Sequence, residues 1–226
     1  LYIKEPTCEF MNEKDAAAFK AQGGEIIYSD PKSPASRITK RLMTVGNPVL
    51  TDTILDESFS YATEGFFQVN IPVYEQALQD MKQWINQDTV IDLYSGVGSI
   101  GLTIGGNHCT LVEVDEHAVR EMKQNITKLN SKAQAILAPS EKALQYITGK
   151  ELVIVDPPRA GLHKDVIERL LESKPARIIY LSCNPVTQAR DVALLAERYG
   201  IRAHRGYNFF PRTPHIEHLL VLDRKL

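Results

Sequence analysis

Cysteine is scarce in this sequence. Its 226 residues include only Cys8, Cys109 and Cys183, which lie far apart and form no Cys-x-x-Cys pair. This spacing excludes a disulfide framework and a complete zinc or iron–sulfur site, so we expect no metal. Unpaired cysteines are typical of a reducing compartment, and we expect a cytoplasmic protein.

Long apolar runs and a dominant charge sign are also missing. No segment approaches the roughly 20 apolar residues that a membrane-spanning helix needs, so we expect no membrane association. With 26 Lys and Arg against 28 Asp and Glu, the formal net charge is −2, which excludes a histone-like polycation. From residue 177 onward, however, eight basic and four acidic residues give a local balance of +4. That balance suits a polyanionic partner, although a basic solvated face would produce it as well.

The composition is that of an ordinary globular protein, with 43% hydrophobic and 24% charged residues. Residues 1–62 are rich in turn formers, with short candidate strands at 25–28 and 58–62, and we interpret them as a partial accessory β-rich unit. Residues 63–226 form the second expected domain. It begins with a helix over 72–84 and continues with short apolar runs that alternate with helical segments, which is the pattern of βαβ units.

This alternation predicts a doubly wound α/β domain with a mostly parallel sheet. The segment between 208 and 217 carries no helical pattern, so we expect the last strand to run antiparallel to the others. The seven expected strands cover 89–93, 109–114, 133–137, 152–155, 178–181, 201–207 and 218–222. The five expected helices between them cover 100–105, 116–130, 141–147, 164–173 and 187–199.

A glycine loop follows the first of these strands. Gly96, Gly98 and Gly101 fit G-x-G-x-x-G between a strand and a helix, and Glu113 ends the next strand, where a carboxylate can hold a ribose. Asp92 stands just before the loop, where its charge would repel a pyrophosphate. A cationic cofactor such as S-adenosylmethionine therefore fits better than NAD. Glycines needed only for a tight turn would explain the loop in purely structural terms.

Two motifs lie where later strands end. Asp156 and Arg159 flank a Pro-Pro pair that rigidifies the loop after the fourth strand. Cys183 follows the fifth strand, just before a helix, where we expect its thiol to be shifted toward the nucleophilic thiolate. A lone cysteine is also a common small core residue.

Two further segments carry candidate functional side chains. The helix-free connection ends in Glu217, the candidate general base, with His215 and His218 as rivals for that role. Ahead of the first helix, Phe66 and Gln68 lie in Gly-Phe-Phe-Gln-Val-Asn, which suits stacking on a base and reading its edge. Aromatic packing in the core explains that segment equally well.

In this order, the motifs at 66–70, 92–101, 156–159, 182–185 and 210–217 closely resemble the RNA uridine carbon-5 methyltransferases of 23S rRNA and tRNA. The resemblance runs from about residue 50 to the C-terminus. It implies a Rossmann-like methyltransferase fold, S-adenosyl-L-methionine as cofactor and an RNA substrate. By motif position it implies Cys183 as nucleophile and Glu217 as base. The implied cofactor contacts are Gln68, Tyr94, Gly96, Gly98, Glu113 and Asp156, and the implied substrate contacts are Phe66, Gln68, Asp156 and Arg159.

Some family features are missing from this sequence. Members usually carry an N-terminal OB-like domain, and many hold an iron–sulfur cluster, so we interpret the chain, which does not begin with Met, as a catalytic fragment. Arg212 stands where the family often has His. The ending around 211–217 is nearer the ribosomal members, which favours 23S rRNA over tRNA. We expect a monomer.

Uridine chemistry gives these residues roles. Addition of the Cys183 thiolate to carbon 6 of uracil would make carbon 5 nucleophilic toward a methyl group, and Glu217 would then remove the carbon-5 proton. An adenine or guanine amino methyltransferase is a rival, but it would typically have an aromatic residue in place of Arg159 and would leave Cys183 idle. A dehydrogenase and a non-catalytic RNA-binding module are two more rival interpretations.

Overall fold

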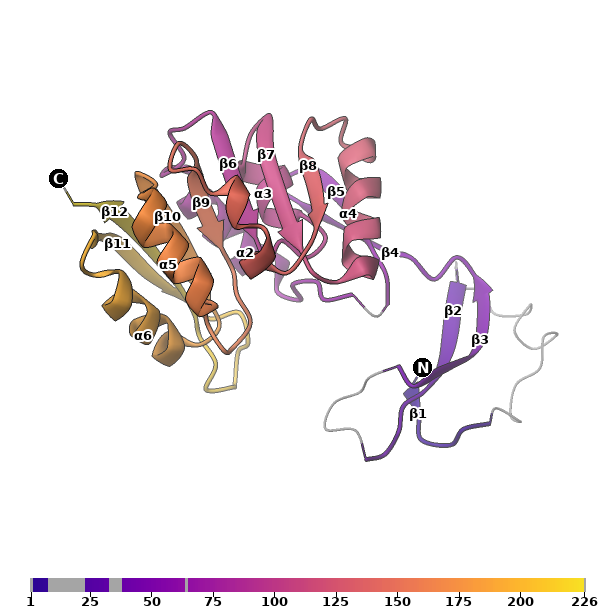
Figure 1. The fold of residues 1–226 in the computed structure, drawn as a ribbon. Coiled ribbons are helices and arrows are strands. Elements are labelled where there is room, and N and C mark those ends of the chain that lie inside the picture. Colours follow the sequence, from indigo (N-terminus) through magenta and orange to yellow (C-terminus); the bar gives the residue numbers. More distant parts are fainter. Residues whose placement is uncertain (1, 8–22, 33–37, 64, 226) are drawn as a thin grey trace.

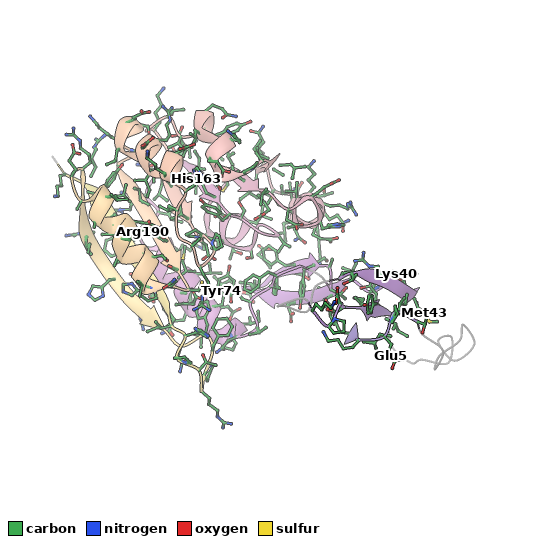
Figure 2. All side chains as sticks on the ribbon, turned by 60° about the horizontal axis from the view of Figure 1, so that its bottom comes forward. Glu5, Lys40, Met43, Tyr74, His163 and Arg190 are labelled. Atoms are coloured by element: carbon green, nitrogen blue, oxygen red, sulfur yellow. The ribbon has the colours of Figure 1, made fainter. Side chains whose placement is uncertain are left out.

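The computed structural model describes residues 2–7, 23–32, 38–63 and 65–225, and Cys8 lies outside these ranges. Figure 1 shows a small sheet at the N-terminal side of a larger α/β unit. The small sheet consists of β1 (Tyr2–Ile3), β2 (Gly23–Tyr28) and β3 (Lys40–Gly46), with β2 in the middle. Its two buried apolar side chains are Ile26 and Ile27, and Figure 2 shows Lys40 and Met43 on the same small unit.

A hairpin connects this sheet to the larger unit. It is formed by β4 (Leu50–Ile54) and β5 (Glu57–Tyr61). Ile54 and Phe59 are fully buried in the same core cluster as the α/β unit. The Asn125 side chain, from a helix of that unit, accepts a hydrogen bond from Ser60 N at 2.8 Å and donates one to Ser60 O at 3.0 Å. The hairpin is thus packed onto the α/β core, while the domain boundary near residue 62 stays a prediction.

The α/β unit is built on a seven-stranded sheet, as the alternating pattern predicts. Its order is β11 (Tyr199–Tyr207), β12 (Glu217–Arg224), β10 (Arg177–Ser182), β9 (Leu152–Val155), β6 (Thr89–Leu93), β7 (His108–Glu113) and β8 (Gln134–Leu137). The last strand, β12, lies between β10 and β11 and runs antiparallel to both. The prediction of an antiparallel last strand is confirmed.

Helices cover both faces of the sheet, so the inner strands are apolar on both sides. On one face α2 (Ile71–Lys82), α3 (Ser99–Ile104) and α4 (Glu116–Lys128) enclose one core cluster. On the other face α5 (Lys164–Ser173) and α6 (Pro185–Leu195) enclose a second cluster. All four residues of β9 are completely buried between the two. No helix in the described ranges is long and apolar enough to cross a membrane.

Two predicted helices differ from the structure. The helix expected over 141–147 is wrong: the segment forms two short 3-10 turns, η1 (Ser140–Lys142) and η2 (Leu144–Tyr146). The backbone bonds there join residues three apart, from Lys142 N to Pro139 O and from Ala143 N to Ser140 O, which is the 3-10 pattern. The helix expected over 187–199 begins at Pro185, where Pro suits a first turn, and ends at Leu195 because β11 begins at Tyr199.

Gly101 fixes the packing of α3 on the sheet. A Cβ at this position would lie 2.2 Å from Leu111 Cδ2 and 2.9 Å from both Asp92 Oδ2 and Cys109 Sγ. We predict that Gly101→Ala lowers the free energy of unfolding by about 1–3 kcal/mol, the usual cost of overpacking a core. Urea unfolding measures the change. Gly200→Ala in β11 is the matched control, since the nearest atom to its new Cβ is 3.9 Å away. Equal stability of both variants would contradict this prediction.

Candidate active site

Strand register brings four candidate side chains to one edge and one face of the sheet. Asp92 pairs with Ile154, so Asp156 lies two residues further along the neighbouring strand. Val155 pairs with Tyr180, and Ser182 pairs with His218. Because side chains alternate between faces, residues 92, 156, 183 and 217 share the parity of Val90, Ile154, Leu181 and Leu219, which point into the α2–α3–α4 core. The sequence pattern indicates that these motifs lie at strand ends, and the register places them on one face.

The glycine loop holds the second-strand carboxylate in place. Gly96 and Gly98 have φ values of +56° and +86°, which glycine adopts without strain. Gly96 N donates to Glu113 Oε2 at 2.9 Å, while Val114 N and Asp115 N donate to Glu113 Oε1 at 2.7 and 2.8 Å. Glu113 is thus a carboxylate anchored by backbone donors at the end of β7.

Asp92 lies underneath the loop, with no exposed surface. Its Oδ2 accepts a hydrogen bond from Gly101 N at 2.9 Å, whereas Oδ1 is buried without a hydrogen-bond partner. Burial raises the pKa of Asp92 to about 8; the Gly101 hydrogen bond acts in the opposite direction, and the charges of Asp156 and Glu113 add smaller upward contributions. Asp92 therefore holds α3 through one carboxyl oxygen, while its other oxygen has no hydrogen-bond partner.

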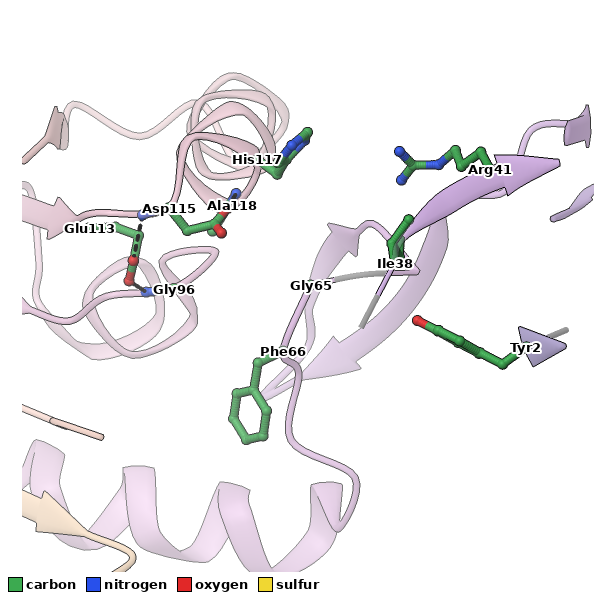
Figure 3. Close-up of a pocket in the computed structure, with 10 residues that line it drawn as sticks. All are labelled: Tyr2, Ile38, Arg41, Gly65, Phe66, Gly96, Glu113, Asp115, His117 and Ala118. Carbon is green, nitrogen blue, oxygen red and sulfur yellow. Dashed lines mark hydrogen bonds between the residues drawn. The ribbon is translucent and has the colours of Figure 1, made fainter. Parts of the chain in front are cut away.

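Residues 65–70, which form the strap before α2, contribute two of the predicted side chains. Phe66 is 71% exposed and lines a cavity of about 600 Å³ together with Gly96 and Glu113 (Figure 3). Gln68 is buried, and its Oε1 has no hydrogen-bond partner. Asn70 Nδ2 donates to Phe209 O at 3.2 Å, which ties the strap to the connection after β11. Phe66 and Glu113 thus share one cavity.

Cys183 is half-buried between the end of β10 and α6. The expectation of a thiol shifted toward thiolate is wrong for the protein without ligands. Burial, together with the charges of Glu217 and Asp156, raises the pKa of Cys183, and the Arg159 guanidinium offsets only part of this effect. Ser182 pairs with His218, so Cys183 stands opposite Glu217 where the two strands meet the edge of the sheet. Burial and the two carboxyl charges therefore make the thiol less acidic than an ordinary cysteine.

Glu217 is buried, with 3% of its surface exposed. Burial, and to a smaller extent Asp156, raises its pKa to about 8. Asp156 itself has a pKa raised to about 7 by burial. A carboxyl that titrates near neutral pH suits proton transfer better than one that is always ionised.

The two rival histidines lie elsewhere. His218 Nδ1 is 2.7 Å from Gln188 Oε1 on α6, on the sheet face opposite to Glu217. His215 is exposed on the connection before β12. Of the three candidates, only Glu217 points into the core where its charge acts on Cys183.

Tyr94 is not brought together with the other predicted residues. Its φ is +63°, and its side chain packs against the core cluster on the α5–α6 face. There it lies beside Ser140 and His163 and lines a second cavity, of about 720 Å³. Only the backbone of Tyr94 lies at the glycine loop. Its side chain and Glu113 line different cavities, so the structure gives no support to the predicted contact of Tyr94 with a cofactor.

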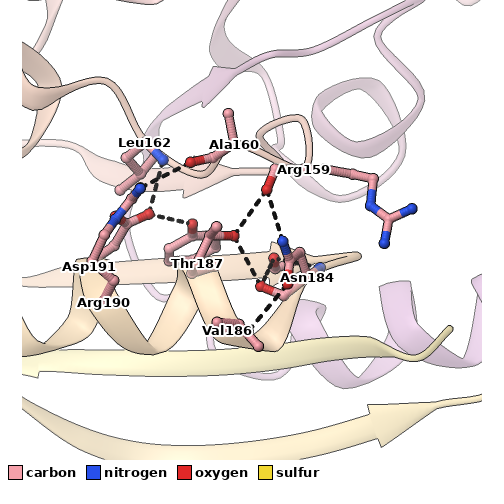
Figure 4. A network of polar contacts seen from close by, with 10 residues as sticks. Arg159, Ala160, Leu162, Asn184, Val186, Thr187, Arg190 and Asp191 are labelled. Atoms are coloured by element: carbon pink, nitrogen blue, oxygen red, sulfur yellow. Dashed lines mark hydrogen bonds and ion pairs between the residues drawn. The ribbon is translucent and has the colours of Figure 1, made fainter. Parts of the chain in front are cut away.

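A polar face of α6, which the sequence reasoning missed, holds the loop that carries Arg159 (Figure 4). Arg159 O accepts hydrogen bonds from Asn184 Nδ2 at 2.9 Å and Thr187 Oγ1 at 3.1 Å. The fully buried Asp191 accepts from Leu162 N and from Tyr180 Oη, each at 2.8 Å. The signal in the sequence is the helical spacing of polar residues 184, 187, 188 and 191 on a helix face that should be apolar.

The raised carboxyl pKa values set the pH dependence of stability. Between its ordinary pKa of 3.8 and its folded pKa of about 8, Asp92 is protonated only in the folded protein. The folded state then binds more protons than the unfolded state, so the free energy of unfolding falls as pH rises through this window. Urea unfolding at a series of pH values should show a shallower fall for Asp92→Asn. The control Asp88→Asn, at an exposed position, should keep the parent slope, and an unchanged slope for Asp92→Asn would refute the assignment.

The chain is similar to known RNA methyltransferases. The family described as tRNA (Uracil-5-)-methyltransferase matches residues 142–225. An uncharacterized RNA methyltransferase of Lactobacillus johnsonii is 34% identical over 93% of this chain and 50% of its own length, and one of Nitratidesulfovibrio vulgaris is 31% identical over 92% and 45%. The chain spans about half the length of these curated relatives.

Solved structures show the same relationship. The tRNA (uracil-54, C5)-methyltransferase of Pyrococcus abyssi, solved in complex with S-adenosyl-L-homocysteine, superposes with a TM-score of 0.85 at 28% identity, over 98% of this chain and 55% of that one. Trm5b of the same organism shares the fold alone, with a TM-score of 0.62, 12% identity, and coverage of 89% and 64%. The fold is therefore that of the S-adenosylmethionine-dependent methyltransferases. The chain is similar over nearly its whole length to RNA methyltransferases, and the family model and the Pyrococcus abyssi structure that it matches are both of uracil-5-methyltransferases.

Proposed function

We propose that this chain is the catalytic part of an enzyme that methylates carbon 5 of a uridine in RNA, through a covalent adduct of Cys183 at carbon 6. One observation carries the proposal: Cys183 directly follows β10 and Glu217 begins its pairing partner β12, beside the end of β9 that is followed by Asp156. A nucleophile beside a buried carboxyl of raised pKa is what addition followed by proton removal requires.

The residues present fit S-adenosyl-L-methionine as the methyl donor. Asp92 Oδ1 and Gln68 Oε1 are buried acceptors without partners, which suits a cofactor that carries an ammonium and a sulfonium group. Glu113 lies in the 600 Å³ cavity with Gly96 and the exposed ring of Phe66. In this proposal Gly96, Gly98 and Glu113 hold the nucleoside, and Gln68, Asp92 and Asp156 face the cationic part. When bound, this cofactor supplies an electrophilic methyl group.

The protein's own side chains would perform the remaining steps. The Cys183 sulfur adds to carbon 6, and the electron pair of the carbon 5–carbon 6 double bond moves toward oxygen 4. Carbon 5, now a nucleophile, accepts the methyl group. The Glu217 carboxylate then removes the carbon-5 proton, the double bond forms again, and Cys183 leaves as thiolate. Arg159, whose charge already favours the thiolate, would also face the uracil, together with Phe66, Gln68 and Asp156.

Both reacting groups hold a proton more firmly than usual before ligands bind. The pKa of Cys183 is raised in part by Glu217, and that of Glu217 in part by Asp156. A cationic cofactor beside these carboxyls would favour their charged forms. We therefore propose that cofactor binding prepares Glu217 to act as a base.

The RNA target follows from resemblance. The ending around Pro211 and Glu217 resembles ribosomal members of the family and favours 23S rRNA, whereas the Pyrococcus abyssi relative is a tRNA methyltransferase. We propose 23S rRNA as the substrate and tRNA as the alternative. An adenine or guanine amino methyltransferase is the second candidate activity, and Arg159 after the Pro-Pro pair counts against it.

Replacing Glu217 tests the mechanism. In Glu217→Gln, Cys183 can still add and carbon 5 can still be methylated, but the carbon-5 proton stays in place and the enzyme is not released. We predict that a covalent protein–RNA adduct accumulates when the variant is incubated with S-adenosylmethionine and an unmodified 23S rRNA transcript. A denaturing gel detects it, with an unmodified tRNA transcript as a second arm.

Two further variants act as controls. The adduct should be missing in the double variant Cys183→Ala, Glu217→Gln. The variant Glu197→Gln, at an exposed glutamate just past the C-terminal end of α6, should turn over normally. Normal turnover of Glu217→Gln would assign the base to another group. Retained methylation by Cys183→Ala would favour the amino methyltransferase.

A further inference from the structure

One stretch of the chain is basic and has no acidic residue. Residues 198–216 contain Arg198, Arg202, Arg205 and Arg212 with His204 and His215, and no Asp or Glu. The stretch comprises β11 and the connection that leads to β12. It ends at Glu217, the buried carboxyl of the candidate active site. The basic surface therefore runs directly into the catalytic edge.

The arginine and histidine side chains of this stretch face solvent. β11 is the edge strand of the sheet, and Arg202, His204, Arg205, Arg212 and His215 are all exposed. In Figure 1 the β11–β12 connection projects from the same side of the molecule to which the arrows of β7 and β9 point. A nine-residue strand spans about 30 Å, so the surface is long enough to follow several nucleotides.

Two of the arginines are held in place by neighbours. The Arg202 guanidinium lies 6.0 Å from the centroid of the Trp84 ring. Arg205 Nη1 donates to Asp80 Oδ2 at 2.7 Å and lies 5.6 Å from the Tyr207 ring centroid, while its side chain stays 51% exposed. Groups that are ordered before binding lose less conformational entropy when they bind a ligand.

The opposite end of the catalytic edge has the other sign of charge. Glu113 and Asp115 line the cavity proposed for the cationic cofactor, where β7 meets α4, and Glu116 follows as the first residue of α4. The charge along the edge thus changes from acidic at β7 to basic at β11, with Cys183 and Glu217 toward the basic end. A polyanion is attracted to the second region and repelled from the first.

We propose that β11 and the β11–β12 connection bind the backbone phosphates of the single-stranded RNA that flanks the target uridine, with Arg202, Arg205 and Arg212 as the contacts. The proposal rests on the function proposed above, since it presumes an RNA substrate. An RNA strand lying along β11 and the connection would be led to Glu217 and Cys183. Phosphate contacts of this kind orient the RNA without reading its sequence.

The salt dependence of RNA binding tests the proposal. We would measure the binding of a short fluorescein-labelled single-stranded RNA by fluorescence anisotropy over a series of salt concentrations. Each phosphate contact contributes about 0.7 to the slope of log K against log salt for single strands. We expect Arg212→Gln to lower the slope by about 0.7 and the triple variant Arg202→Gln, Arg205→Gln, Arg212→Gln to lower it by about 2. The loss should be equal for RNAs with and without uridine.

Controls separate this surface from general charge and from folding. Lys123→Gln removes the same charge from an exposed position on α4, at the other end of the sheet, and should leave the slope unchanged. Calorimetric binding of S-adenosylhomocysteine should be equal in all variants, which shows that they are folded. Arg212 lies on an exposed connection, so its variant is informative even if the triple variant is unstable.

The outcomes distinguish this proposal from the proposed function. An unchanged slope for Arg212→Gln, an equal loss for Lys123→Gln, or no RNA binding by the parent would overturn the basic surface as the RNA site. The covalent adduct of Glu217→Gln tests the methylation chemistry separately, so it can succeed while the surface assignment fails. If the arginine variants lower the salt slope but Glu217→Gln forms no adduct, the RNA-binding surface stands and the proposed methylation mechanism is overturned.

Discussion

The arrangement of this protein depends on three carboxyl groups at one edge of a sheet, of which Asp92 and Glu217 are buried and Asp156 is partly buried. Asp92, Asp156 and Glu217 come from three strands, and register and side-chain parity place them on the same face. Water is largely excluded there, so burial raises each of their pKa values into the range of about 7 to 8. Three carboxyl groups in one site favour a bound cation. Because they titrate near neutral pH, they can also exchange protons with a substrate.

The remaining site features are consequences of this constraint. Gly101 leaves room for α3 to pack directly on the strand, which brings its backbone N–H within hydrogen-bond distance of Asp92. Cys183, beside two of the carboxyls, is less acidic than its position at a helix start suggests. Arg159 opposes that effect, and the polar face of α6 holds the Arg159 loop through Asn184 and Thr187.

Much of the architecture follows from the sequence because strand and helix periods are local. The boundaries of β6, β9 and α5 agree with their apolar patterns, and the missing helix between β11 and β12 correctly indicates an antiparallel last strand. The motifs also mark the right strand ends, because ligand-binding loops of such sheets follow the strands.

Other features are set by contacts distant in sequence, which a local pattern does not contain. Tyr94 belongs to the glycine-loop motif, but its left-handed backbone turns the side chain to the opposite face, toward Ser140. The direction of the Cys183 pKa shift depends on Glu217, 34 positions later in the chain, which only the folded sheet brings near. Asp191 is buried because Leu162 N and Tyr180 surround it, and the helix pattern alone indicates only an unusual polar face.

The most direct measurement of the central claim is peptide mapping by mass spectrometry after the unaltered chain is incubated with S-adenosylmethionine and RNA that contains 5-fluorouridine. Fluorine at carbon 5 leaves no proton for Glu217 to remove, so the reaction should stop after methyl transfer. We predict a nucleotide adduct on the peptide that contains Cys183, carrying both the fluorine and one added methyl group. Methylated RNA without any adduct on Cys183 would contradict it.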